Sequence, residues 1–190
     1  MVDGQGQANL ERREGELQIP VLTTPRLILR EFRNEDFEAY AEFSADEEVM
    51  RYLTGKPMTR VEAWRHMAML VGHWTLRGYG PWAVEERETG RFMGRIGINH
   101  PEGWPALEVG WTLGRPFWGK GYATEGARAA LDYAFNVLNR DHVISLIQPQ
   151  NLGSIAVAER LGETVEGETE VMGINVLIYG IDRPGKKEVD

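Results

Sequence analysis

The stretch Trp118-Gly119-Lys120-Gly121-Tyr122-Ala123 decides the fold, because a β-like run precedes it and a helical pattern follows it. The run from Leu107 to Leu113 alternates apolar and polar residues, whereas apolar residues recur at helical spacing from Thr124, the predicted N-cap, to Leu138. A glycine turn between a strand and a helix directs unpaired backbone N–H groups and the positive end of the helix dipole toward one point. The sequence therefore predicts a phosphate or pyrophosphate site at the start of this helix.

Two other phosphate-binding loops fit this stretch less well. Residues 114–120 match the GxxxxGK of a nucleoside-triphosphate loop, but Gly121 stands where that loop needs the Ser or Thr hydroxyl that binds Mg²⁺. The dinucleotide pattern GxGxxG also fails, because Thr124 occupies the place of its third glycine. A turn whose glycines only form the corner between strand and helix is the structural alternative.

With its flanks, the loop resembles the acyl-CoA loop of the GNAT superfamily of N-acetyltransferases, whose pattern is Gln/Arg-x-x-Gly-x-Gly/Ala. Gly121 and Ala123 match its last two positions, and Trp118 stands at the Gln/Arg position, a substitution familiar in the RimJ/RimL-type branch that acetylates protein N-termini. Residues 108–113 resemble the Glu-Ile-Gly-Tyr-Trp-Leu that precedes the loop in that branch.

Two further motifs occur in the order that the superfamily has them. Residues 151–162 resemble its Asn-x-x-Ala/Ser-Ile-x-x-x-Glu-Lys-Leu-Gly, and residues 24–30, Thr-Pro-Arg-Leu-Ile-Leu-Arg, resemble the first strand of the RimJ/RimL-type branch. The resemblance extends from Thr23 to Ile181. Three motifs in order are far more specific than any one of them.

The resemblance implies that acetyl-CoA is the cosubstrate and that no metal is required. It also places an unpaired backbone N–H at a strand bulge, where the N–H polarises the thioester carbonyl. The residues that it assigns to acetyl-CoA binding are Trp111, Thr112, Leu113, Trp118, Gly119, Lys120, Gly121, Tyr122, Ala123, Thr124 and Asn151.

Composition narrows the class of protein. A chain of 190 residues suits one domain, which buries roughly 70% of its unfolded surface, and the lack of cysteine excludes disulfides and thiolate sites. Residues 1–20 have no apolar segment typical of a signal peptide, and no apolar run reaches the about 18 residues of a membrane span. The net charge of −8 argues against a nucleic-acid partner. We therefore expect a cytoplasmic monomer or homodimer without nucleic-acid or membrane partners.

The order of secondary structure predicts a mixed α/β fold. We expect polar tails at residues 1–20 and 182–190 and a single domain at residues 21–181. Within it the patterns give a strand, two or three helices, three strands, a helix, a strand, a helix and two strands, which predicts a mixed sheet with helices on both faces. The resemblance implies the same GNAT fold, with a mostly antiparallel sheet of about seven strands that splays between the fourth and fifth.

Glu108 is the candidate general base. Alternation within residues 107–113 places it on one face of the strand with Gly110 and Thr112. A glutamate flanked by apolar residues in a central strand is costly unless it has a function or a partner. Its functional role would be proton abstraction through water, with a pKa raised by burial. Its structural alternative is an ion pair with an arginine such as Arg95 across the sheet.

Ser154 is the candidate donor to the leaving thiolate. Many GNAT members use a Tyr seven residues after the motif Asn, but that position is Ala158 here. Ser154, three residues after Asn151, is the nearest hydroxyl, and the alternative is an ordinary serine in the first turn of a helix. Asn151 either hydrogen-bonds the pantetheine or caps the helix, and the two roles are compatible.

The sequence thus predicts an N-acetyltransferase that transfers the acetyl group of acetyl-CoA directly to a primary amine in a ternary complex. The α-amino group of a protein or peptide is the favoured acceptor, and a small amine, such as a polyamine or an antibiotic, is the alternative. A non-catalytic acyl-CoA-binding module is the alternative from another class, and a P-loop phosphotransferase is a more distant one.

Overall fold

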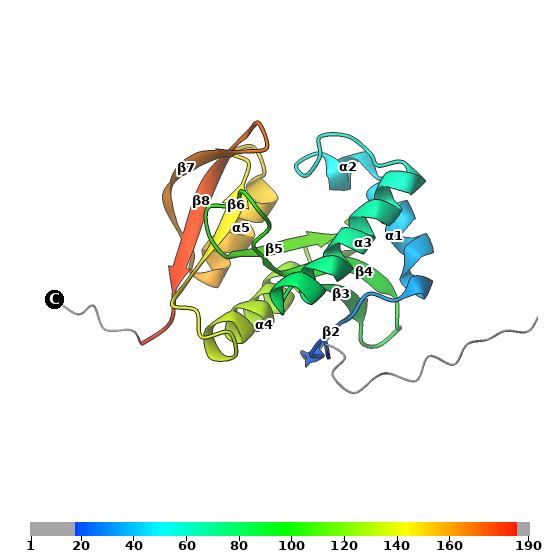
Figure 1. Ribbon diagram of the computed structural model, residues 1–190, viewed down its shortest axis with the longest axis horizontal. Coiled ribbons are helices and arrows are strands. Elements are labelled where there is room, and N and C mark those ends of the chain that lie inside the picture. The colour runs from blue at the N-terminus through cyan, green and yellow to red at the C-terminus, as the bar shows by residue number, and fades with distance from the viewer. Residues whose placement is uncertain (1–17, 186–190) are drawn as a thin grey trace, which may run out of the picture.

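The computed structural model describes residues 18–185 as one open sheet with helices on both faces (Figure 1). The strands are β1 (Leu22–Thr23), β2 (Leu27–Arg30), β3 (Pro81–Glu86), β4 (Phe92–Asn99), β5 (Glu108–Leu113), β6 (His142–Ile147), β7 (Thr164–Val171) and β8 (Ile174–Asp182). The helices are α1 (Phe37–Ser44), α2 (Glu47–Met50), α3 (Arg60–Arg77), α4 (Tyr122–Asn136) and α5 (Leu152–Leu161), with 3₁₀ turns η1 (Asn34–Asp36) and η2 (Arg115–Phe117).

The eight strands lie in the order β1-β2-β3-β4-β5-β6-β8-β7, and every neighbouring pair is antiparallel except β5 and β6. The predicted mixed, mostly antiparallel sheet is therefore confirmed. The two-residue strand β1 is additional to the expected strands. The expected tails fall largely on residues 1–17 and 186–190, outside the described residues, although Asp182 still belongs to β8 and the Pro20 carbonyl accepts a hydrogen bond from Trp82 Nε1 at 2.7 Å.

Apolar clusters on both faces fix the helices to the sheet. On one face, Ala127, Ala130 and Ala134 of α4 are fully buried, and these small side chains let the helix lie close to the strands. On the other face, Tyr40 of α1 and Leu70 of α3 belong to a second cluster, with Phe92 of β4 packed against it. The strands between the two clusters are therefore covered on both sides.

The start of α3 follows its sequence signal. The sequence Thr59-Arg60-Val61-Glu62 fits the pattern of a capping box, and the structure forms one: the Thr59 hydroxyl accepts the Glu62 N–H at 3.3 Å, and the Glu62 carboxylate accepts the Thr59 N–H at 2.7 Å. Gly78 ends the helix with a φ of 75°, a conformation that glycine adopts without strain.

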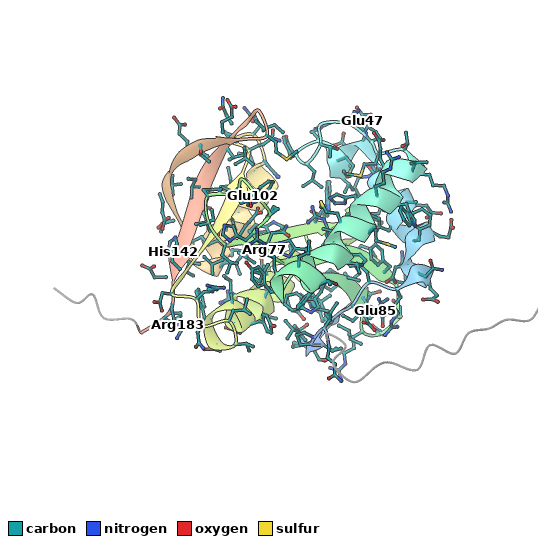
Figure 2. All side chains as sticks on the ribbon, in the orientation of Figure 1. Glu47, Arg77, Glu85, Glu102, His142 and Arg183 are labelled. Atoms are coloured by element: carbon teal, nitrogen blue, oxygen red, sulfur yellow. The ribbon has the colours of Figure 1, made fainter. Side chains whose placement is uncertain are left out.

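The loop between β4 and β5 is anchored to the end of α3. The His100 N–H donates to His73 Nε2 at 3.1 Å. Arg77 Nη2, in the last turn of α3, lies 3.7 Å from Glu102 Oε2 in the loop (Figure 2). These contacts hold the loop that carries Trp104 over the start of β5.

The sheet divides between β5 and β6. Their one register pair is Glu108 with Ile144, where the Ile144 N–H donates to the Leu107 carbonyl at 2.9 Å. The next carbonyl that faces β6 is that of Val109, and it accepts a hydrogen bond from the hydroxyl of Ser145 at 2.9 Å instead of from a backbone N–H of β6. Beyond this point the strands separate, in agreement with the expected splay.

Candidate active site

A cavity of about 1120 Å³ occupies the wedge where β5 and β6 separate. Its walls come from α2 and the turn after it, the end of β5, the loop into α4 and the first turns of α5. All eleven residues assigned to acetyl-CoA from the sequence line it, and Ser154 lines it too, whereas Glu108 does not. Gln148 Nε2 donates to the Tyr52 carbonyl at 3.2 Å and so joins the end of β6 to the turn after α2.

The glycine loop forms an anion-binding site. Gly119 and Gly121 have φ values of 71° and 79°, which turn the chain sharply before α4. Within the described chain, the backbone N–H groups of residues 119–124 have no backbone acceptor, and the first N–H to find one is that of Glu125, which donates to the Gly121 carbonyl at 3.0 Å. Six consecutive free donors at a helix N-terminus suit a pyrophosphate. The residues present therefore fit acetyl-CoA.

The start of α4 corrects one expectation. The helix begins at Tyr122 with Gly121 as its N-cap, not at Thr124, and no side chain caps it. The capping prediction is wrong, because no side chain accepts the first N–H groups of α4. Here Thr124 lies inside the first turn, which leaves those groups available to a ligand.

Arg26 holds this loop in place, a role that the sequence did not reveal. Its Nε donates to Glu125 at 2.6 Å, its Nη1 donates to the Lys120 carbonyl at 2.9 Å, and its guanidinium stacks 4.4 Å from the centre of the Tyr122 ring. The Thr24-Pro25-Arg26 motif was the available signal, but it indicated only a strand start. Arg26 therefore positions the glycine loop although it lies 94 residues before Lys120 in the sequence.

The first prediction concerns Gly121. A Cβ at this position would lie 3.4 Å from Arg26 Nη2. The substituted residue would also have to adopt the left-handed φ of Gly121, which is strained for a β-branched side chain. We expect Gly121→Val to abolish measurable CoA binding in calorimetry, because the side chain displaces the loop and occupies the approach of the phosphate. Lys120→Ala, which removes only an exposed and flexible cation, should weaken binding mildly. Unchanged CoA affinity in a folded Gly121→Val protein would contradict the assignment.

The free backbone edge of β5 lies against the same cavity. The register of β4 and β5 is continuous from Gly94–Leu113 to Asn99–Glu108, so no bulge interrupts their pairing at Trp111 to Leu113. The N–H groups of Trp111 and Leu113 point toward β6, and no strand partner reaches them within residues 18–185, because the two strands have already separated. No bulge frees a backbone N–H here, so the expected bulge is wrong. The separation of β5 from β6 instead leaves backbone N–H groups of β5 available to the thioester carbonyl.

Ser154 lies across the wedge from this edge. Its hydroxyl oxygen accepts the Trp111 Nε1–H at 3.3 Å, which leaves the hydroxyl proton available to a second partner. Its backbone N–H donates to Asn151 Oδ1 at 3.2 Å, so Asn151 is the N-cap of α5. Ala158 is fully buried and offers no hydroxyl. Ser154 is therefore the hydroxyl on α5 that faces the cavity.

The second prediction tests Ser154. Removing a well-aimed donor to developing negative charge costs roughly 10²–10³-fold in rate, and a serine hydroxyl is a poor proton source. We expect Ser154→Ala to lower kcat by up to about 10²-fold with a smaller change in KM. Steady-state kinetics in which kcat is unchanged would return Ser154 to an ordinary role in the helix.

Glu108 lies on the β5 face opposite α4. Burial raises the pKa of its carboxyl, while the Trp104 Nε1–H, which donates to Glu108 Oε2 at 2.7 Å, opposes part of that rise. Arg95 acts on it only through longer-range electrostatics, since no ion pair joins the two within the described chain. The proposed ion pair with Arg95 is therefore wrong, and Trp104 is the hydrogen-bond donor that the sequence missed.

Other classes of site find no support in residues 18–185. No group of three or more His, Asp or Glu side chains is arranged to hold a metal ion in this part of the chain. None of the helices described is both long and apolar enough to cross a membrane.

Comparison with known proteins agrees with this geometry. The acetyltransferase (GNAT) domain model matches residues 26–164. An uncharacterized N-acetyltransferase, p20, of Bacillus licheniformis is 33% identical over 149 residues, which cover 77% of this chain and 83% of that protein. Spermidine N(1)-acetyltransferase of Escherichia coli K12 is 28% identical over 142 residues, or 74% of each chain. The crystal structure of an acetyltransferase from Agrobacterium tumefaciens C58 superposes with a TM-score of 0.79 at 35% identity, over 91% of this chain and 100% of that one. A glycine loop of free N–H groups, a splayed sheet and these relatives lead to one conclusion: the chain belongs to the GNAT family of acetyltransferases.

Proposed function

We propose that this N-acetyltransferase transfers acetyl from acetyl-CoA to the α-amino group of a protein or peptide, by direct attack within a ternary complex. The observation that supports the proposal is that one strand, β5, borders the cavity at its end and carries the buried carboxyl group of Glu108 at its start. Its backbone edge at Trp111 and Leu113 faces the cavity that leads to the glycine loop. Its side chain at Glu108 lies on the adjoining face with a raised pKa.

Each residue has a defined task in this reaction. The N–H groups of residues 119–124 bind the pyrophosphate, which places the thioester, the source of the acetyl group, in the wedge. The free N–H groups of β5 stabilise negative charge on the carbonyl oxygen. Glu108 accepts a proton from the attacking amine, through water, as the C–N bond forms. Ser154 donates a hydrogen bond to the sulfur as the C–S bond breaks, and CoA leaves as a thiolate that takes its proton from water.

The acceptor is tested by measuring free thiol released from acetyl-CoA. Three acceptors are compared at pH 7: a peptide with a free N-terminus, a lysine peptide with a blocked N-terminus, and spermidine. We expect the free N-terminus to react fastest, because a tenth or so of α-amines are neutral at this pH against fewer than about one lysine in a thousand. A faster reaction with the lysine peptide would refute the N-terminal assignment.

A small polyamine is the second candidate acceptor, because the chain resembles a spermidine N(1)-acetyltransferase over 74% of its length. Fastest turnover of spermidine in the same assay would favour it. CoA binding by calorimetry, with no thiol released by any of the three amines, would instead indicate a non-catalytic acyl-CoA-binding module.

A further inference from the structure

One face of β4 and β5 carries two charges separated by glycine. The strands pair Asn99 with Glu108, Gly97 with Gly110, and Arg95 with Thr112. Paired residues share a face, so Glu108 and Arg95 lie on the same side, four residues apart along the strands, or about 14 Å. We call this surface the acceptor face; it consists of Arg95, Gly97, Asn99, Glu108, Gly110 and Thr112.

The glycine pair leaves the middle of the acceptor face without side chains. A Cβ added at Gly110 would find no protein atom within 4 Å except the Glu108 carboxyl group, at 3.8 and 3.9 Å. Gly97 is required for a different reason, since a Cβ there would lie 2.4 Å from the Pro81 Cα. The space directly over Gly110 therefore borders the Glu108 carboxyl group, within reach of an acceptor amine.

At its end of the acceptor face, Arg95 is not paired with a carboxylate within residues 18–185. It is half-buried, and its guanidinium makes no hydrogen bond or ion pair to any residue in the described range. Its neighbours Tyr40 and His66 are neutral. The Tyr40 hydroxyl and His66 Nδ1 are hydrogen-bonded to each other, and burial, with a smaller contribution from the Arg95 charge, lowers the pKa of His66 to about 3. Desolvated cations normally require a partner.

A second arginine in the same fold shows the usual solution. Arg30 is 6% exposed, and it donates to both oxygens of Asp36 at 2.8 Å and to Glu85 at 2.8 Å. The protein therefore pairs a buried arginine fully where its role is structural. Arg95, with its donors free on the acceptor face, has the properties of a ligand-binding residue.

We propose that Arg95 binds a carboxylate of the acceptor while the acceptor amine lies over Gly110 beside Glu108. This inference rests on the proposed acetyl transfer and specifies the class of acceptor. A single guanidinium flanked by neutral groups matches one monovalent anion, which Arg binds through two parallel hydrogen bonds. The spacing suits a carboxylate within one or two residues of the amine in an extended peptide. The acceptor is thus an acidic N-terminus and not a polyamine.

The test uses three peptides that differ only in their second residue, which is Asp, Asn or Lys, and spermidine. We expect wild-type kcat/KM to fall in the order Asp, Asn, Lys, with spermidine poorest. Arg95→Gln should lower kcat/KM for the Asp peptide by roughly 10- to 100-fold, mainly through KM, and leave the Asn peptide nearly unchanged. Arg95→Glu should reverse the order of the Asp and Lys peptides. Arg65→Gln, which removes an exposed cation from α3, is the matched control and should change none of these values.

Two readouts keep this inference separate from the proposed function. Peptide binding is measured by calorimetry in the presence of CoA, so that affinity is known whether or not acetyl is transferred. Equal affinities for the Asp and Asn peptides, or an equal loss with all acceptors in Arg95→Gln, would overturn the role of Arg95. Binding that prefers the Asp peptide, with no thiol released, would support Arg95 and refute the acetyl transfer.

Discussion

Replacing Glu108 with Gln should slow acetyl transfer to an α-amine at pH 7 by about 10²- to 10⁴-fold, the usual contribution of a general base. Its carboxyl has a pKa raised by burial, which brings it toward the pKa of about 7.7–8.0 of the amine that it must deprotonate. At pH 9 most of the α-amine is already neutral, so the variant should recover much of its rate. The measurement is a pH–rate profile of both proteins on one N-terminal peptide.

Trp104→Phe is the matched control for this base. The indole N–H that donates to Glu108 at 2.7 Å lowers its pKa, so losing the N–H should raise that pKa further and shift the acid limb of the profile to higher pH, with the plateau preserved. A deficit in Glu108→Gln that is equal at every pH would show that Glu108 is not the base.

Glu163→Gln should make the protein more stable at high pH by an amount on the order of 5 kcal/mol, the largest change in folding stability that we expect from one conservative substitution. Glu163 is 3% exposed, and neither carboxylate oxygen has a hydrogen-bond partner in the described chain. Burial raises its pKa to about 8. The nearby Ser145 hydroxyl opposes only part of that rise, and in the structure it donates to the Val109 carbonyl at 2.9 Å.

The sign of the effect follows from the two pKa values of Glu163. An unfolded glutamate has a pKa of 4.5 and the folded one about 8, so between these values the native state binds the extra proton. The stabilising contribution of the neutral carboxyl is complete below pH 4.5 and is lost as the pH rises to 8 and beyond. Wild type and Glu163→Gln should therefore have similar stability at pH 5 and diverge toward pH 9.

Urea unfolding at pH 5, 7 and 9 checks this prediction. Glu159→Gln, an exposed change on α5, serves as the control and should differ from wild type by a constant amount. If wild type and Glu163→Gln show the same dependence of unfolding free energy on pH, Glu163 does not titrate in the way its burial requires.

Local signals in the sequence were sufficient for the sheet and the glycine loop. The alternation through β5 correctly separated Glu108 and Thr112 from Val109, and the capping box at Thr59 marked the start of α3 to the residue. Both depend on neighbours within a few positions, which is the range over which backbone geometry acts.

The features that the sequence did not reveal depend on contacts between distant segments. Arg26 meets Glu125 across 99 positions, and no spacing rule connects them. Glu163 follows Gly162 in a stretch rich in charge, which suggests solvent exposure, and only the tertiary fold buries it beside Ser145 of β6. The residues that deviate most from local rules are thus those that tertiary structure alone defines.

Because β5 and β6 share a single register pair, the sheet consists of two halves with few hydrogen bonds between them. We call this boundary the β5–β6 junction; the hydroxyl of Ser145, which donates to the Val109 carbonyl, adds one further contact across it. The glycine loop belongs to one half of the sheet and the N-terminal turn of α5 to the other. A coenzyme bound in the cavity would therefore contact both halves and hold them together. By binding, the coenzyme raises the free energy of separating the two halves at the β5–β6 junction, as well as that of global unfolding, by RT ln(1 + [L]/Kd). Amide hydrogen exchange in β6 should therefore slow on CoA binding, even though no residue of β6 lines the cavity.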